Sequence, residues 1–116
     1  MYREIELMES SNGKCEALEF IEKQNDKTQR KIEYVFKLIE DIEVVPKEYF
    51  KKLLGHIYEI RVQSGNNIFR FLSFFHKGDL VIVTHGFQKK TRKTPSREVE
   101  KAEKLREEYL ERLKKQ

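Results

Sequence analysis

The spacing of hydrophobic residues in the first 41 positions predicts one strand followed by two helices. Met1 to Met8 alternates, with Ile5 and Leu7 on one side, which is typical of a strand with one wet face. After a turn at 10–13, apolar residues recur at helical spacing from Lys14 to Gln24. A second helix is predicted from Asp26 to about Asp41, where Asp26 and Gln29 resemble a capping box. We expect these two helices to form a hairpin across one face of a sheet.

The second part of the chain predicts an antiparallel meander and a final helix. Pro46 ends any helical continuation, so Val44 to Gly55 is predicted to be a connector with one short turn at 49–52. Three runs rich in β-branched and aromatic residues follow and are separated by turn signals; they are His56–Val62, Ile68–Phe75 and Leu80–Phe87. Thr94 as cap and Pro95 as first residue open an amphipathic helix. Residues 1–116 are therefore predicted to form a single compact α+β domain, with an N-terminal strand, a two-helix hairpin, a three-stranded antiparallel meander and a C-terminal helix.

Two arginines interrupt the apolar positions of the meander. Because side chains alternate between the faces of a strand, Arg61 and Arg70 are predicted to lie opposite the face that packs beneath the helices. The short loop at 64–67 places them on neighbouring strands, but their register stays open. They are predicted either to bind an anion or to pair with a carboxylate such as that of Glu59.

Charge is distributed unevenly along the chain. The formal net charge is +4, yet residues 1–48 carry a net −4, residues 49–97 a net +8 and residues 98–116 none. A concentrated basic segment of this kind favours a phosphate-containing partner. A signal-peptide core and an apolar run of membrane-spanning length are both absent, and the single cysteine fits a reducing compartment. We therefore expect a cytoplasmic protein with no membrane partner.

The candidate chemistry is phosphodiester cleavage without a metal or cofactor. Glycine-rich phosphate loops, Cys/His metal clusters and Ser/His/Asp arrangements are absent from the sequence. In RNA the 2′-hydroxyl can attack its own 3′-phosphate, which requires a proton acceptor and cations around the phosphate. Arginine forks match phosphate oxygens and stay charged. The candidate catalytic residues are Arg61, Arg70, His85, Lys89 and Lys90.

The acid/base assignment stays open at the level of sequence. His85 titrates near neutrality, but a histidine at a strand end often only hydrogen-bonds the backbone. A lysine crowded by other cations loses its proton more easily, so Lys89 or Lys90 is an alternative. The further basic residues, Lys51, Lys52, Arg92 and Lys93, are predicted to contact RNA.

Several of these segments resemble the HigB branch of the RelE-type toxins, a family often described as phage-derived proteins. The resemblance spans about Phe50 to Ala102, and its most specific elements are Gly-Phe-x-Lys-Lys-Thr and Thr-Pro. The segments that carry it are Tyr58-Glu59-Ile60-Arg61-Val62, Ile68-Phe69-Arg70-Phe71, His85-Gly86-Phe87-Gln88-Lys89-Lys90-Thr91 and Thr94-Pro95. One departure concerns the catalytic tyrosine that many RelE-type enzymes carry near the C-terminus. Tyr109 lies instead on the apolar stripe of the last predicted helix.

The resemblance implies the toxin of a type II toxin–antitoxin system. It implies a RelE-like fold and a ribosome-dependent mRNA endoribonuclease, an mRNA interferase that inhibits translation. By position, Arg61 and Arg70 would hold phosphate, Lys89-Lys90 would support the transition state and His85 would be a candidate acid or base. The implied partners are ribosome-bound mRNA and a HigA-like helix-turn-helix antitoxin, with promoter DNA bound only through the antitoxin complex.

Two other functions are compatible with the same residues. A non-catalytic RNA- or antitoxin-binding module would need the same cations. A DNA-binding regulator is less consistent with the sequence, because no predicted helix carries a concentrated basic face.

Overall fold

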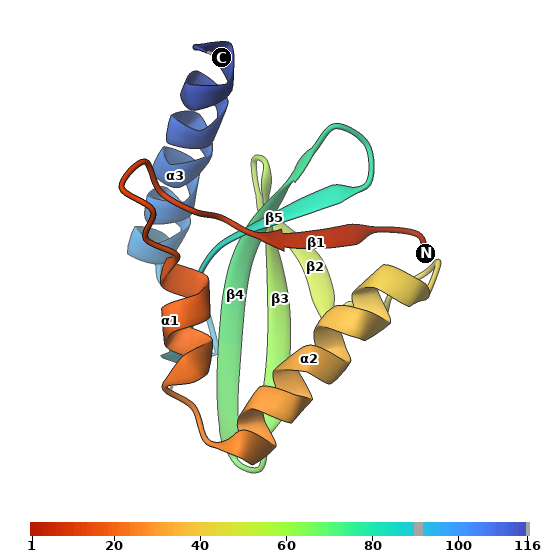
Figure 1. The fold of residues 1–116 in the computed structure, drawn as a ribbon. Coiled ribbons are helices and arrows are strands. Elements are labelled where there is room, and N and C mark those ends of the chain that lie inside the picture. The colour runs from red at the N-terminus through yellow and green to blue at the C-terminus, as the bar shows by residue number, and fades with distance from the viewer. Residues whose placement is uncertain (90–91, 116) are drawn as a thin grey trace.

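The computed structural model describes residues 1–89 and 92–115 and forms one mixed sheet with helices on both faces. The sheet has five strands in the order β1-β5-β4-β3-β2. Helices α1 and α2 lie across one face, and α3 packs on the other (Figure 1). The elements are β1 (Glu4–Leu7), α1 (Glu16–Glu22), α2 (Asp26–Asp41), β2 (Phe50–Leu54), β3 (Ile57–Ser64), β4 (Asn67–His76), β5 (Leu80–Lys89) and α3 (Ser96–Lys114). The α+β class is confirmed. The predicted strands and helices follow one another as expected, but strand β2 is additional, and the sheet of the described residues has five strands instead of a three-stranded meander.

Strand β2 lies where we predicted a connector with a short helical turn, so that prediction was wrong. A backbone hydrogen bond of 3.0 Å from Tyr49 to Pro46 turns the chain, and Phe50 then pairs with Ile60 of β3. The Phe50 ring stacks on Tyr58 with centroids 5.2 Å apart. Burial of this ring beneath the helices stabilises the strand, although two lysines follow it.

Strand β1 forms the opposite edge and runs parallel to β5, pairing Ile5 with Val81. The Arg3 guanidinium ties this edge to the end of α2, because it donates to the carbonyls of Ile39, Ile42 and Glu43 at 2.6–2.8 Å. These carbonyls have no partner within the helix, so Arg3 satisfies acceptors that the end of a helix leaves open.

Both predicted helix caps differ in the structure. Asn25, rather than Asp26, caps α2, since its side chain accepts the Thr28 N–H at 2.8 Å. Gln29 donates its side-chain amide to the carbonyl of Gln24 instead of closing a capping box. Helix α3 begins at Ser96 without a side-chain cap, and the Thr94 hydroxyl binds elsewhere.

The predicted faces of the meander are confirmed. Ile60, Phe69 and Phe71 pack beneath α1 and α2, whereas Leu72 and Phe74 pack against α3. The apolar stripe of α3 contributes Val99, Ala102, Leu105 and Tyr109 to this second cluster. No helix within 1–89 and 92–115 is long and apolar enough to cross a membrane.

A β-bulge at Thr84 changes which side chains of β5 face α3. Ser73 of β4 pairs with Val83, and the preceding Leu72 pairs with His85, so Thr84 is the extra residue. Before the bulge, the odd-numbered Val81 and Val83 pack beneath α1 and α2. After it, the odd-numbered residues lie on the α3 face, because an extra residue reverses the alternation. His85, Phe87 and Lys89 therefore share the face that carries Arg61 and Arg70.

Candidate functional site

A two-residue turn brings Arg61 and Arg70 directly opposite each other. Ser64 pairs with Asn67, and the left-handed Gly65 (φ +61°) begins the turn, as a type II′ turn requires. Counting back along both strands pairs Arg61 with Arg70. Like charges at directly opposed positions destabilise a sheet. This arrangement needs either a carboxylate or an anionic ligand to balance it.

A buried network holds Arg70. Its Nη1 lies 2.7 Å from Glu59 Oε1, and the two side chains are 4% and 1% exposed. The Thr94 hydroxyl donates to the other Glu59 oxygen, and Arg70 Nη2 donates to the Arg92 carbonyl at 3.2 Å. Of the two roles left open for Arg70, the structure therefore shows pairing with Glu59. The network also fixes the segment before α3 against the sheet.

Arg61 has no such partner. Its side chain is half-buried and makes no hydrogen bond or ion pair with the residues that the structure describes. Glu59 lies on the same face, but Arg70 and Thr94 occupy its two oxygens. Among residues 1–89 and 92–115, nothing therefore competes with an anion for the Arg61 guanidinium.

Lys89 lies at the end of β5 and is 7% exposed. Its Nζ has no hydrogen-bond partner among residues 1–89 and 92–115, and the same holds for Arg70 Nε. Burial has the largest effect on the pKa of the Lys89 ammonium and lowers it from its ordinary value of 10.5. The positive charge of Arg70 lowers it further. Buried donors without partners are rare and costly, so two of them on residues that line one pocket indicate a site for an anion.

These groups line one pocket of about 560 Å³. Its cationic side chains are Arg61, Arg70, Lys89 and Arg92, and its polar neutral ones are Asn66, Asn67 and Gln88. No carboxylate is among the described residues that line it, because Glu59 lies beneath Arg70. The pocket can therefore bind a phosphate with arginine and amide donors and place an amine of lowered pKa beside it.

His85 lies outside this pocket. Its Nε2 is 3.1 Å from Glu98 Oε1 and its Nδ1 is 3.0 Å from the Thr84 hydroxyl, so both ring nitrogens are engaged. Burial has the largest effect on the pKa of His85 and lowers it from the ordinary 6.5. The positive charge of Lys101 lowers it further, and Glu98 acts in the opposite direction. About 13 Å of strand separates it from Lys89. His85 therefore connects β5 to α3 and does not reach the Arg61 side chain.

The remaining predicted contacts divide between the two faces. Lys51 pairs with Glu59 and so lies on the face of the pocket, where its charge contributes to the lowered pKa of Lys89. Lys52 pairs with Tyr58 and points to the other face. Arg92 lines the pocket, and Lys93 is exposed beside it. Lys90 lies outside the described residues.

Sequence reasoning missed one role at this site, because Thr94 was assigned to a helix cap and instead donates its hydroxyl to Glu59. Pairing of an arginine with Glu59 was one of the two alternatives that the sequence left open. The alternation of β3 already placed Glu59 on the face of Arg61. Across the described parts of the chain, no group of three His, Cys, Asp or Glu side chains is arranged to hold a metal ion.

The lowered pKa of Lys89 predicts a pH dependence of stability. The folded protein binds fewer protons than the unfolded chain between the lowered pKa and 10.5. The free energy of unfolding should therefore rise with pH through that interval. Lys89→Met is expected to remove this rise, measured by urea unfolding at a series of pH values.

Tyr109 acts in the opposite direction. Burial raises its pKa from 10.0, so it lowers stability at higher pH. Since the wild type and Lys89→Met both contain Tyr109, the difference between their curves of unfolding free energy against pH gives the contribution of Lys89 alone. Parallel curves for the wild type and Lys89→Met would contradict the burial of a titrating amine at this position.

Comparison with known proteins gives one family. The profile of the phage-derived Gp49-like proteins (DUF891) matches residues 19–107, which include the second half of α1, all of α2, the whole pocket and the first half of α3. A comparison with curated proteins gave no match. The matched segment covers most of the chain. The protein therefore belongs to the phage-derived Gp49-like family, which is toxin-like and of the RelE/HigB type.

Proposed function

We propose that this protein is the toxin of a type II toxin–antitoxin system and cleaves mRNA on the ribosome without a metal. The observation that carries the proposal is the pocket that Arg61 and the buried Lys89 amine line together, neither with a partner among residues 1–89 and 92–115. Membership of a toxin-like family supports it. The resemblance of Arg61, Arg70 and the segment 85–91 to the HigB branch supports the finer assignment to that branch.

The proposed reaction uses the RNA's own nucleophile. The 2′-hydroxyl attacks the adjacent phosphorus, the bond to the 5′-oxygen breaks, and the products are a 2′,3′-cyclic phosphate and a 5′-hydroxyl. Arg61 donates to the phosphate oxygens, whose charge increases in the transition state. Lys89, whose lowered pKa increases its neutral fraction, takes the proton of the 2′-hydroxyl. The protonated amine then adds a cation beside the phosphate, and the departing 5′-oxygen takes a proton from water.

Arg70 has a supporting role in this scheme. Its pair with Glu59 fixes its guanidinium at the base of the pocket and leaves Nε without a partner. Its positive charge lowers the pKa of the Lys89 ammonium, against a smaller opposing effect of Glu59, and so favours the neutral amine. Lys51, Arg92 and Lys93 would contact RNA on either side of the reacting phosphate. Promoter binding would occur only with a helix-turn-helix antitoxin.

The proposal is tested by inducing the protein in cells and mapping new 5′ ends on a translated mRNA by primer extension. We expect growth arrest together with new ends that disappear when translation of that mRNA is blocked. Growth arrest without new ends would exclude cleavage. Ends that persist without translation would exclude dependence on the ribosome.

A binding module without catalysis is the second candidate. It is favoured by the position of His85, which is held by Glu98 and Thr84 away from the pocket. This candidate predicts that purified protein binds single-stranded RNA and leaves its length unchanged on ribosomes.

A further inference from the structure

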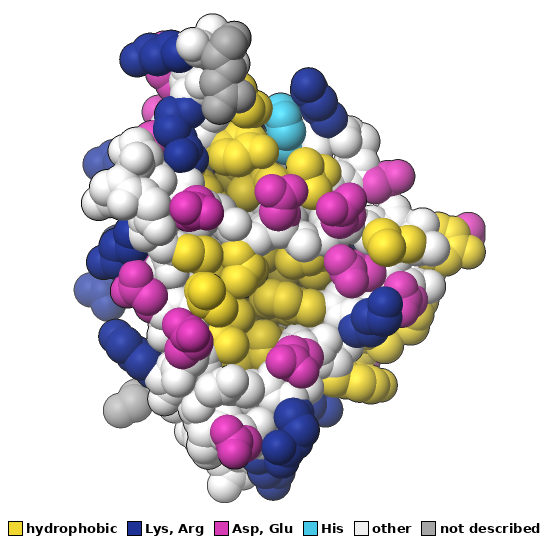
Figure 2. All heavy atoms as spheres, viewed as in Figure 1, with side chains coloured by type: hydrophobic (Ala, Val, Ile, Leu, Met, Phe, Trp, Pro, Cys, Tyr) yellow, Lys and Arg dark blue, Asp and Glu magenta, His cyan; other side chains and the backbone are white. Residues whose placement is uncertain are grey.

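The face opposite the pocket carries an apolar groove. It lies between α1, α2 and β1 and has a volume of about 350 Å³. Its apolar lining residues are Ile5, Leu7, Leu18, Ile21, Ile32 and Phe36. Figure 2 shows these elements from the front, with a hollow of hydrophobic side chains open to solvent between the two helices. Leu18 is 44% exposed at its edge. Apolar surface left open in this way marks a site of interaction.

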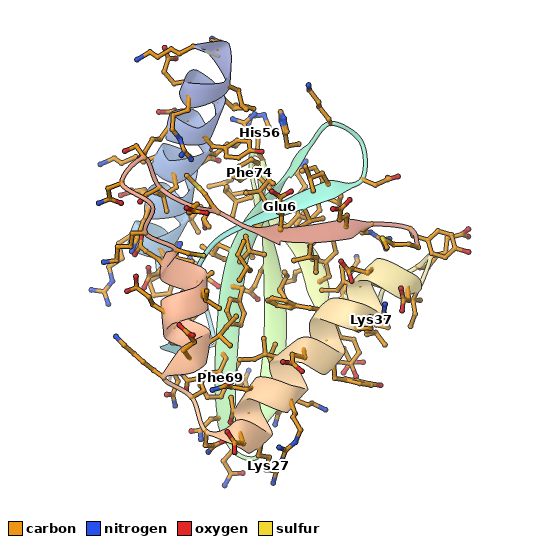
Figure 3. The ribbon with its side chains drawn as sticks, viewed as in Figure 1. Glu6, Lys27, Lys37, His56, Phe69 and Phe74 are labelled. Carbon is orange, nitrogen blue, oxygen red and sulfur yellow. The ribbon has the colours of Figure 1, made fainter. Side chains whose placement is uncertain are left out.

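The rim of the groove is acidic. Glu33 and Glu40 line it, and Figure 2 shows acidic side chains around the hollow. The one basic side chain among its lining residues is Lys37, labelled in Figure 3, and Asp41 pairs with it at 3.3 Å. The segment that forms this face, residues 1–48, has a net charge of −4. A nucleic acid would be repelled here, whereas a cationic partner would be attracted.

The backbone of β1 is poorly placed to accept an added strand. The Ile5 N–H donates to the Glu40 carboxylate at 2.9 Å. The N–H groups of Tyr2 and Arg3 both donate to the Glu40 carbonyl. Since Glu40 occupies these donors along the sheet edge, an occupant of the groove must bind through its side chains. A helix that inserts apolar side chains fits this requirement, and an extended peptide does not.

From the groove, its acidic rim and the occupied strand edge, we infer that this face binds an amphipathic helix of a protein partner, with an apolar stripe flanked by lysine and arginine. The apolar side chains, one turn apart along the helix, enter between α1 and α2. The flanking cations meet Glu33 and the neighbouring carboxylates. This inference does not depend on RNA cleavage, because the groove and the basic pocket lie on opposite faces of the sheet.

A synthetic helical probe tests the inference on the full-length protein. The probe has about 18 residues, or five turns, with leucine on one stripe, lysine on both flanks and one tryptophan. Since the protein contains no tryptophan, probe fluorescence reports binding directly. We expect saturable binding by the lysine-flanked probe and at least about tenfold weaker binding by a glutamate-flanked probe of the same stripe.

Two groove variants and two matched controls locate the binding. Leu18→Ser and Glu33→Lys are each expected to weaken binding about tenfold, since each changes an exposed groove residue. The controls are Leu54→Ser, at a leucine on β2 that is 69% exposed, and Glu48→Lys, at an exposed residue before β2. Neither control should change the affinity. Unfolding curves of all four variants verify that each protein is folded.

Three results would overturn the inference. Equal affinity of the wild type and both groove variants would place the probe elsewhere. Equal affinity of the lysine-flanked and glutamate-flanked probes would show that the acidic rim does not select a cationic helix. A concentration-dependent dimer that Leu18→Ser abolishes in sedimentation would make a second copy of the chain the occupant. RNA cleavage is a separate measurement, so its absence would leave these outcomes unchanged.

Discussion

Glu59→Ala is expected to lower the free energy of unfolding by about 3–5 kcal/mol, the largest stability effect we anticipate. The change leaves the Arg70 guanidinium buried without its counter-ion and removes the acceptor of the Thr94 hydroxyl. A buried unpaired charge is far more costly than a lost surface ion pair. Urea unfolding of the purified variant measures the effect.

The companion experiment removes both charges. Glu59→Leu combined with Arg70→Leu is expected to recover most of the lost stability, because apolar residues of similar size often replace a buried ion pair without loss. Lys101→Ala supplies the comparison, since the side chains of its ion pair with Glu16 are 44% and 35% exposed and the change should alter stability by less than about 1 kcal/mol. An undiminished free energy of unfolding in Glu59→Ala would show that Arg70 does not depend on this carboxylate.

In the mechanism that we propose, Arg61→Ala should reduce RNA cleavage by about 10²- to 10³-fold, the typical effect of removing one preorganised donor to a transition-state oxyanion. Its stability should hardly change, because the Arg61 side chain has no partner among the described residues and faces Arg70 across the strands. Loss of a like charge at an opposed position can even stabilise the sheet. The measurement is the rate of appearance of new 5′ ends on ribosome-bound mRNA.

Arg30→Ala is the matched control for this change. Arg30 is an exposed arginine on α2, on the other side of the sheet. It should leave both cleavage and unfolding unchanged. Arg61→Lys should recover only part of the rate, since an ammonium group cannot bind two phosphate oxygens as a guanidinium does. Full cleavage activity of Arg61→Ala would show that this pocket is not the catalytic site.

Much of the sheet could be predicted because its chemistry is local. The alternation of Tyr58, Ile60 and Val62 fixed the inner face of β3. The Gly65-Asn66 turn is compatible with the observed pairing of Arg61 and Arg70. Strand β2 was missed because its Lys51-Lys52 pair weakens the strand pattern, and only contact with Ile60 and Tyr58 reveals the role of Phe50.

The candidate site was harder to predict because it depends on a bulge. If β5 alternated regularly through Thr84, Lys89 would face α1 and α2. The residues Val83-Thr84-His85 contain no local sequence signal that predicts the bulge. The same bulge directs His85 toward Glu98. The pairing of these two residues could not be predicted from their residue types alone. Arg61 and Lys89 were predicted as candidates from their charge, but their shared pocket follows from tertiary pairing.

The pairing of β1 with β5 has a consequence for protein synthesis. Glu4 lies beside Leu80, so the first strand has no partner until most of the chain has been translated. Helices α1 and α2 likewise emerge before the strands that they cover. Contacts between such distant segments form late in folding. We expect the nascent chain to stay incompletely folded, and therefore inert, until β5 leaves the ribosome that makes it.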